Sequence, residues 1–82
     1  METAVKVSVI VYTKPNCVQC TATFKKLDEL GIDYATVDLT EDNEALERLK
    51  ERGYLQAPVV ETGDSIWSGY RPDRVKALAR SS

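Results

Sequence analysis

The sequence contains no histidine, only two cysteines, and one residue each of tryptophan, methionine and phenylalanine among its 82 residues. A tetrahedral structural zinc needs four Cys or His ligands, so one chain cannot complete such a site, and only a metal shared between subunits stays open. The longest apolar run is far shorter than the roughly 20 residues that a membrane-spanning helix needs. A net charge of −2 leaves no basic surface for nucleic acid or an anionic membrane.

The composition, with 43% hydrophobic and 29% charged residues, is typical of an ordinary globular domain. Residues 1–82 are predicted to form one domain, near the small end of what folds alone. Met1 to Ala4 show no basic start followed by an apolar stretch, so we predict no signal peptide and a cytoplasmic protein. In a reducing cytoplasm, two closely spaced cysteines are more often catalytic or metal-binding than a structural crosslink.

The two cysteines lie where a predicted strand ends and a predicted helix begins. The run Val7–Tyr12 is short, apolar and rich in β-branched residues, which favours a buried strand, and residues 13–16 have the composition of a turn. Cysteines three positions apart share a helical face and can close a small disulfide ring. Only Cys20 continues the apolar stripe of this helix, which comprises Cys20, Phe24, Leu27 and Leu30.

Cys17 is the predicted reactive thiol. It lies at the start of the helix, where unpaired backbone N–H groups and the positive end of the helix dipole favour an anion. A Cys-X-X-Cys pair in this setting commonly lowers the pKa of its first thiol below the free value of about 8.5, and Lys14 adds a nearby positive charge. The thiolate is the nucleophile of disulfide exchange, so Cys17 is predicted to attack a substrate disulfide and Cys20 to resolve the mixed disulfide.

The remaining chain alternates between strand and helix patterns. Pro58 opens the third strand, a turn signal separates it from the fourth, and Pro72 suits the first position of the last helix. The predicted order is β-α-β-α-β-β-α, with the first two strands parallel, which gives a small mixed sheet packed against helices. The predicted elements are strand 5–12, helix 17–30, strand 32–38, helix 42–52 capped by Thr40 or Asp42, strand 58–61, strand 66–68 and a helix from residue 72.

Cys-X-X-Cys after the first strand of a βαβ unit, followed by Pro58 at the third strand, resembles the thioredoxin fold. The resemblance implies an α/β domain with a four-stranded mixed sheet flanked by three helices. It also implies that the Ala57–Pro58 bond is cis and that Pro58 packs beside the reactive disulfide. The backbone edge next to this proline, at Ala57, is then expected to pair with an incoming peptide.

Within this fold, the lead-in Tyr12-Thr13-Lys14-Pro15 is similar to that of glutaredoxins. Two pieces with which glutaredoxins hold glutathione differ here. The usual Thr-Val-Pro is replaced by Gln56-Ala57-Pro58, and a Gly-Gly pair is replaced within Trp67-Ser68-Gly69-Tyr70-Arg71-Pro72. Together with Cys-Val-Gln-Cys, this segment resembles the NrdH-redoxins, which have glutaredoxin-like sequences and thioredoxin-like behaviour.

The resemblance to NrdH-redoxins implies a thiol–disulfide oxidoreductase that carries electrons on a redox-active disulfide and needs no cofactor. Thioredoxin reductase would reduce it, and the large subunit of class Ib ribonucleotide reductase would receive its electrons; a monomer is expected. The alternatives are a glutathione-dependent glutaredoxin, a non-catalytic redox-sensing protein and a shared metal or iron–sulfur site. The predicted supporting residues are Lys14 and Pro58, and the predicted partner-binding residues are Val18, Gln19, Ala57, Trp67, Ser68, Gly69 and Tyr70.

Overall fold

The computed structural model describes residues 9–63 and 65–81. The order of its elements is the predicted one. No helix in these ranges combines the length and the apolar character that crossing a bilayer requires. The elements are β1 (Ile10–Thr13), α1 (Val18–Glu29), β2 (Ala35–Asp38), α2 (Asn43–Glu51), β3 (Val59–Glu61), β4 (Ile66–Ser68) and α3 (Pro72–Ser81).

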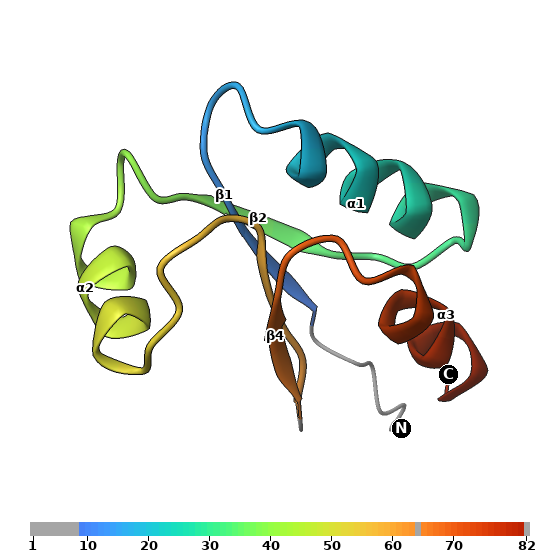
Figure 1. Cartoon of the computed structure of the whole chain (residues 1–82). Coiled ribbons are helices and arrows are strands. Elements are labelled where there is room, and N and C mark those ends of the chain that lie inside the picture. Colours follow the sequence, from blue (N-terminus) through green and yellow to red (C-terminus); the bar gives the residue numbers. More distant parts are fainter. Residues whose placement is uncertain (1–8, 64, 82) are drawn as a thin grey trace, which may run out of the picture.

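The four strands form one mixed sheet in the order β2-β1-β3-β4. β1 runs parallel to β2, with Val11 opposite Thr36, and antiparallel to β3, with Val11 opposite Val60. β4 extends the sheet antiparallel to β3. Figure 1 shows α2 on one side of this sheet and both α1 and α3 on the other. This is the predicted sheet flanked by three helices.

The second strand starts later in the structure than the sequence predicts. The second strand begins at Ala35 rather than at residue 32, because the chain is still closing α1 there. Gly31 has a φ of 69°, its N–H donates to the Asp28 carbonyl, and the Ile32 N–H donates to the Leu27 carbonyl. This pair of bonds is a Schellman motif, which occupies the first residues of the predicted strand. The other predicted strand, 5–12, lies outside the described residues for positions 5–8.

The two faces of the sheet bury separate apolar clusters, which fix α1 and α2 in place. Beneath α1 and α3 the buried members are Val9, Val11, Leu27, Val60, Trp67 and Val75. Beneath α2 they are Tyr12, Ala45, Leu49 and Val59. Thr23 is also buried in α1, which the apolar pattern does not predict, and its hydroxyl donates to the Gln19 carbonyl at 2.9 Å.

Tyr12 joins three elements through its buried hydroxyl group. The hydroxyl donates to Glu61 Oε1 in β3 at 2.8 Å and accepts from Arg48 Nη2 in α2 at 3.1 Å. Burial is the main cause that raises the pKa of Tyr12 above its ordinary value of 10.0, and the bond to Glu61 adds to it, while Arg48 partly opposes both. The phenol is therefore held in its neutral form.

Tyr12→Phe is expected to lower the free energy of unfolding by about 1–2 kcal/mol at neutral pH, because the hydrogen bonds to Glu61 and Arg48 are lost. Because the pKa of Tyr12 is raised in the folded state, its contribution to the free energy of unfolding is complete below pH 10.0. That contribution is lost as the pH rises through the folded-state pKa. The gap between wild type and variant should therefore narrow above pH 10.0. Urea unfolding at neutral and alkaline pH measures it. A gap that stays constant would contradict this role of Tyr12.

Candidate active site

The β1–α1 loop delivers Cys17 to the first turn of a helix. Asn16 takes a φ of 59°, a left-handed conformation that asparagine tolerates because its short polar side chain can hydrogen-bond locally. Cys17 follows with extended dihedrals (φ −112°, ψ 103°) and is the N-cap of α1. The Cys20 N–H donates to Cys17 Sγ at 3.1 Å. The sulfur thus takes the place that a serine or aspartate oxygen has in an ordinary N-cap.

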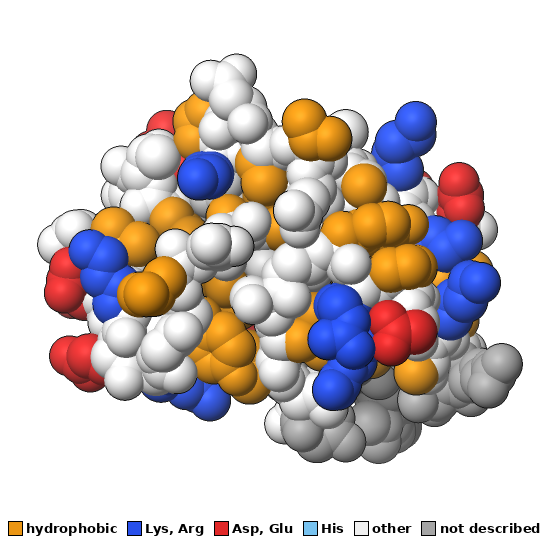
Figure 2. Space-filling model, viewed as in Figure 1, with side chains coloured by type: hydrophobic (Ala, Val, Ile, Leu, Met, Phe, Trp, Pro, Cys, Tyr) orange, Lys and Arg blue, Asp and Glu red, His pale blue; other side chains and the backbone are white. Residues whose placement is uncertain are grey.

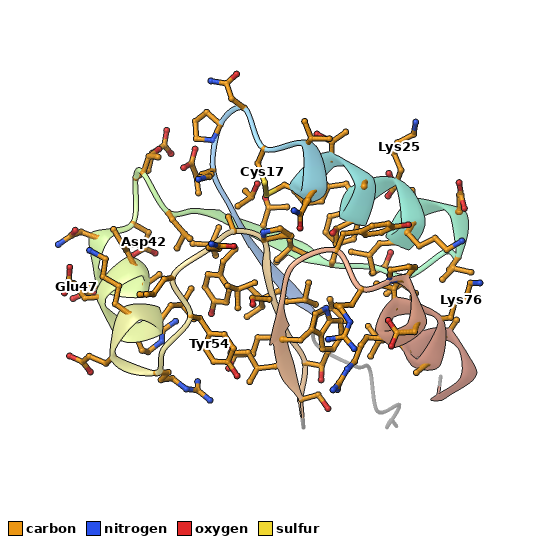
Figure 3. All side chains as sticks on the ribbon, in the orientation of Figure 1. Cys17, Lys25, Asp42, Glu47, Tyr54 and Lys76 are labelled. Carbon is orange, nitrogen blue, oxygen red and sulfur yellow. A yellow bond between two sulfur atoms is a disulfide. The ribbon has the colours of Figure 1, made fainter. Side chains whose placement is uncertain are left out.

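Cys17 and Cys20 are joined by a disulfide bond, with their Cα atoms 5.2 Å apart. The two sulfur-bearing side chains are not equally accessible. Cys17 is partly exposed, whereas Cys20 is 2% exposed and faces the interior. Figure 3 shows Cys17 where the loop enters the helix. An attacking group can therefore approach through Cys17 only.

The surroundings of Cys17 favour a negative charge on its sulfur. The first turn of α1 carries no acidic side chain. A depression of about 390 Å³ opens beside Cys17, and Lys14 is the one charged residue among the described residues that line it. The free N–H groups of the helix start and this cation act in the same direction. These surroundings are of the kind that the sequence prediction of a reactive thiolate at Cys17 requires, and the reactivity itself stays a prediction.

The segment before β3 lies beside this helix start. The Ala57–Pro58 peptide bond is cis, the isomer that the resemblance implies, and Pro58 is buried. Among the described residues, no hydrogen bond engages the backbone N–H or carbonyl of Ala57. The donor and the acceptor that the sequence prediction assigns to an incoming peptide are thus unpaired within the described residues.

The loop between β4 and α3 binds both of these segments. The Gly69 N–H donates to the Pro58 carbonyl at 2.8 Å, and the Tyr70 N–H donates to Gln19 Oε1 at 3.1 Å. Gly69 has a φ of 85°, which its lack of a Cβ allows. The predicted residues Gln19, Pro58, Gly69 and Tyr70 are therefore brought together.

Trp67 does not belong to the surface of this site, although the sequence places it among the partner-binding residues. It is 5% exposed and packs in the cluster beneath α1 and α3. The Arg74 guanidinium lies 5.8 Å from its ring centroid. Apolar area drives a tryptophan on a strand into the core of a small domain. Trp67 is therefore a core residue that packs beneath the loop that follows it.

Three large hydrophobic side chains are exposed in the described part of the chain: Val18 (84%), Leu55 (75%) and Tyr70 (36%). Val18 follows Cys17, and Tyr70 is bound to Gln19, so both adjoin the disulfide. Leu55 was not predicted. It lines a second depression of about 270 Å³ together with Lys14 and Ala57, so this hollow adjoins the first at Lys14.

Figure 2 shows hydrophobic groups over much of this face, with charged groups both at its edge and among them. Leu55 could have been suspected from its sequence, because it follows the helix-ending Gly53 and joins no apolar periodicity. No group of three or more His, Cys, Asp or Glu side chains that could hold a metal ion occurs within residues 9–63 and 65–81.

A cysteine pair at a helix start, beside a cis-proline on a four-stranded mixed sheet, defines a thiol–disulfide oxidoreductase of the thioredoxin fold. Residues 9–67 match the family model of glutaredoxin. The chain is 40% identical to the glutaredoxin-like protein NrdH of Escherichia coli K12, over 85% of this chain and 86% of that protein. It is 38% identical to NrdH of Lactococcus lactis subsp. cremoris, over 87% and 99% of the two chains.

A solved structure of the E. coli NrdH-redoxin, a glutaredoxin-like protein with a thioredoxin-like activity profile, superposes with a TM-score of 0.85. That match has 39% identity and covers 87% of this chain and 93% of the other. The chain belongs to the glutaredoxin family and, within it, to the NrdH glutaredoxin-like proteins. The resemblance seen in the sequence is thereby confirmed, and the roles of individual residues stay predictions.

Proposed function

We propose that this chain is a cytoplasmic electron carrier that reduces protein disulfides, with Cys17 as nucleophile and Cys20 as resolving thiol. Thioredoxin reductase recharges it at the expense of NADPH, and the large subunit of a class Ib ribonucleotide reductase receives its electrons. The observation that carries the proposal is the position of Cys17 Sγ. It is partly exposed, accepts the Cys20 N–H at 3.1 Å, and has a buried partner sulfur behind it.

In the first step, the thiolate of reduced Cys17 attacks one sulfur of the substrate disulfide. The substrate S–S bond breaks, a bond between Cys17 and that sulfur forms, and the second substrate sulfur leaves as a thiolate that takes a proton from water. The hydrogen bond from the Cys20 N–H and the positive helix end keep Cys17 ionised before the attack. The exposed side of Cys17 receives the substrate.

In the second step, Cys20 loses its proton and attacks Cys17 Sγ. The mixed disulfide breaks, the second substrate sulfur leaves as a thiolate that takes the proton lost by Cys20, and the Cys17–Cys20 disulfide seen in the structure forms. Two electrons and two protons have then passed to the substrate. Because Cys20 is 2% exposed, its thiol is shielded from other disulfides and reacts with its neighbour.

The substrate polypeptide is held beside Cys17 by the cis-proline segment. The free N–H and carbonyl of Ala57 would pair with the backbone of the substrate in the manner of an added strand. Val18, Leu55 and Tyr70 would cover its apolar side chains. A polypeptide satisfies all of these contacts, and its reactive disulfide then lies next to Cys17.

Two features support a thioredoxin-like partner choice over glutathione. The E. coli NrdH-redoxin, which this chain resembles at 39% identity, has a thioredoxin-like activity profile. The face around Cys17 carries three exposed hydrophobic side chains and a single lining cation, Lys14. Protein interfaces gain from exposed apolar anchors, whereas a small charged peptide gains little from them.

A pair of coupled assays tests the partner choice. The protein should reduce insulin disulfides with thioredoxin reductase and NADPH, and should do so at least about tenfold less efficiently with glutathione and glutathione reductase. A glutaredoxin that is known to use glutathione is the positive control for the second system. Efficient turnover only with glutathione would overturn the proposal and establish the chain as a glutathione-dependent glutaredoxin.

The recipient of the electrons is tested separately. Purified class Ib ribonucleotide reductase should form deoxyribonucleotides in the presence of this protein, thioredoxin reductase and NADPH. Each turnover of the ribonucleotide reductase oxidises one dithiol, which this protein would reduce again. The Cys17→Ser protein is the matched control. Ribonucleotide reduction that is equally fast with that control would exclude this chain as the electron donor.

A further inference from the structure

Gln19 makes a long-range contact that its place between the two cysteines does not predict. Its Oε1 accepts the Tyr70 N–H at 3.1 Å across 51 positions of sequence. Among the described residues, no other side-chain hydrogen bond links α1 to the β4–α3 loop. A Cβ placed on Gly69 would come within 3.5 Å of the same oxygen, so the amide of Gln19 lies directly against this loop.

Both ends of this contact are anchored. The Gln19 carbonyl accepts the hydroxyl of Thr23, which is fully buried in α1. On the loop side, the Gly69 N–H donates to the Pro58 carbonyl at 2.8 Å. Consecutive residues of one loop therefore bind two different segments, the cis-proline segment through Gly69 and the cysteine-bearing helix through Tyr70.

The loop is held at its two ends, where Ser68 pairs with Val59 in the sheet and the Arg71 carbonyl accepts the N–H groups of Arg74 and Val75, and its middle is exposed. Tyr70 is 36% exposed, and Ser68 and Arg71 beside it are exposed as well. An exposed residue without its hydrogen bond regains backbone freedom, which a binding partner would then have to remove at a cost in affinity. The bond from Gln19 removes that freedom before the partner arrives.

We propose that Gln19 is a positioning residue that fixes Tyr70 relative to Cys17, so that a protein partner meets a preformed docking surface. The inference rests on the proposed function and deepens it. Gln19 acts through the loop and does not itself touch the substrate. The partner class is a folded protein that covers Cys17 and Tyr70 together, because a small disulfide reaches Cys17 without the loop.

Two variants of Gln19 separate its hydrogen bond from its bulk. Gln19→Met has nearly the same length and lacks the acceptor oxygen, whereas Gln19→Glu keeps an oxygen that can accept the Tyr70 N–H. Steady-state reduction of each protein by thioredoxin reductase and NADPH gives kcat and KM. Amide hydrogen exchange of Tyr70, with Val60 of the central strand β3 as reference, reports whether the bond is present.

With Gln19→Met, KM for the reductase should rise about tenfold while kcat changes by less than about twofold. Exchange of the Tyr70 amide should quicken at least about tenfold, with Val60 unchanged, because only the local bond is lost. Gln19→Glu should restore a slow Tyr70 amide and a KM within about threefold of wild type. If Gln19→Met acted only by disturbing the packing of the fold, Gln19→Glu would not be expected to restore both quantities.

A normal KM for Gln19→Met would overturn the inference, because the partner would then not depend on Gln19 at all. A raised KM with an unchanged exchange rate of the Tyr70 amide would overturn it too, because the partner would then contact Gln19 directly. Failure of Gln19→Glu to restore both quantities would overturn it as well. If thioredoxin reductase does not reduce the wild-type protein, the proposed function fails and the inference falls with it. If thioredoxin reductase does reduce the wild-type protein and the KM for Gln19→Met is normal, only the inference about Gln19 fails.

Discussion

Cys17→Ser is expected to abolish disulfide reduction, leaving only the background rate of the assay mixture. A serine hydroxyl is not ionised at neutral pH and cannot form a mixed disulfide, so the first bond of the cycle is never made. Cys20 cannot take over, because it is 2% exposed and lies behind the helix start. The insulin-reduction assay, driven by thioredoxin reductase and NADPH, measures the loss.

The fold should survive this replacement. A serine at the N-cap of α1 can accept the Cys20 N–H in place of the sulfur, and serine is a preferred residue at this position. Circular dichroism and urea unfolding of the reduced proteins serve as the control for folding. Turnover of Cys17→Ser at more than a small fraction of the wild-type rate would mean that Cys20 is the attacking thiol.

Cys20→Ser is expected to stop the cycle one step later and to capture the substrate. Cys17 keeps its exposed position and attacks once, but no second thiol is present to release the adduct. The variant should therefore form one covalent adduct per chain with a disulfide substrate, while its steady-state turnover falls to background. Intact-protein mass spectrometry gives the stoichiometry, and peptide mapping gives the site.

The adduct must be located on Cys17 and must disappear on addition of dithiothreitol. Cys17→Ser, treated identically, is the matched control and should form no adduct. A Cys20→Ser protein that continues to turn over would show that an external thiol resolves the mixed disulfide, which is the behaviour of a glutathione-dependent enzyme. Stable partner binding without any covalent adduct would instead indicate a redox-sensing protein.

Local sequence signals predicted the order of the elements, because periodicity, caps and turns act within a few residues. Asp42 is the N-cap of α2, one of the two predicted candidates, and its carboxylate accepts the Ala45 N–H at 3.0 Å. The unequal burial of Cys17 and Cys20 followed from the same periodicity. The cis isomer at Pro58 came from the resemblance, since no local signal selects it.

Contacts between distant segments could not be read from periodicity. The bond from Tyr70 to Gln19 and the Tyr12 hydroxyl network each join residues from separate elements. Thr23 reads as polar, yet it is buried because its hydroxyl has an acceptor one turn earlier in α1. Trp67 was predicted to take part in partner binding, and the structure buries its side chain in the core.

The most direct test of the central claim is the pH dependence of the alkylation of Cys17 in reduced Cys20→Ser protein. Iodoacetamide reacts with the thiolate, so its rate follows the ionised fraction. The account predicts a midpoint clearly below the free-thiol value of about 8.5, because the helix start and Lys14 favour the anion. A midpoint at or above that value would contradict it.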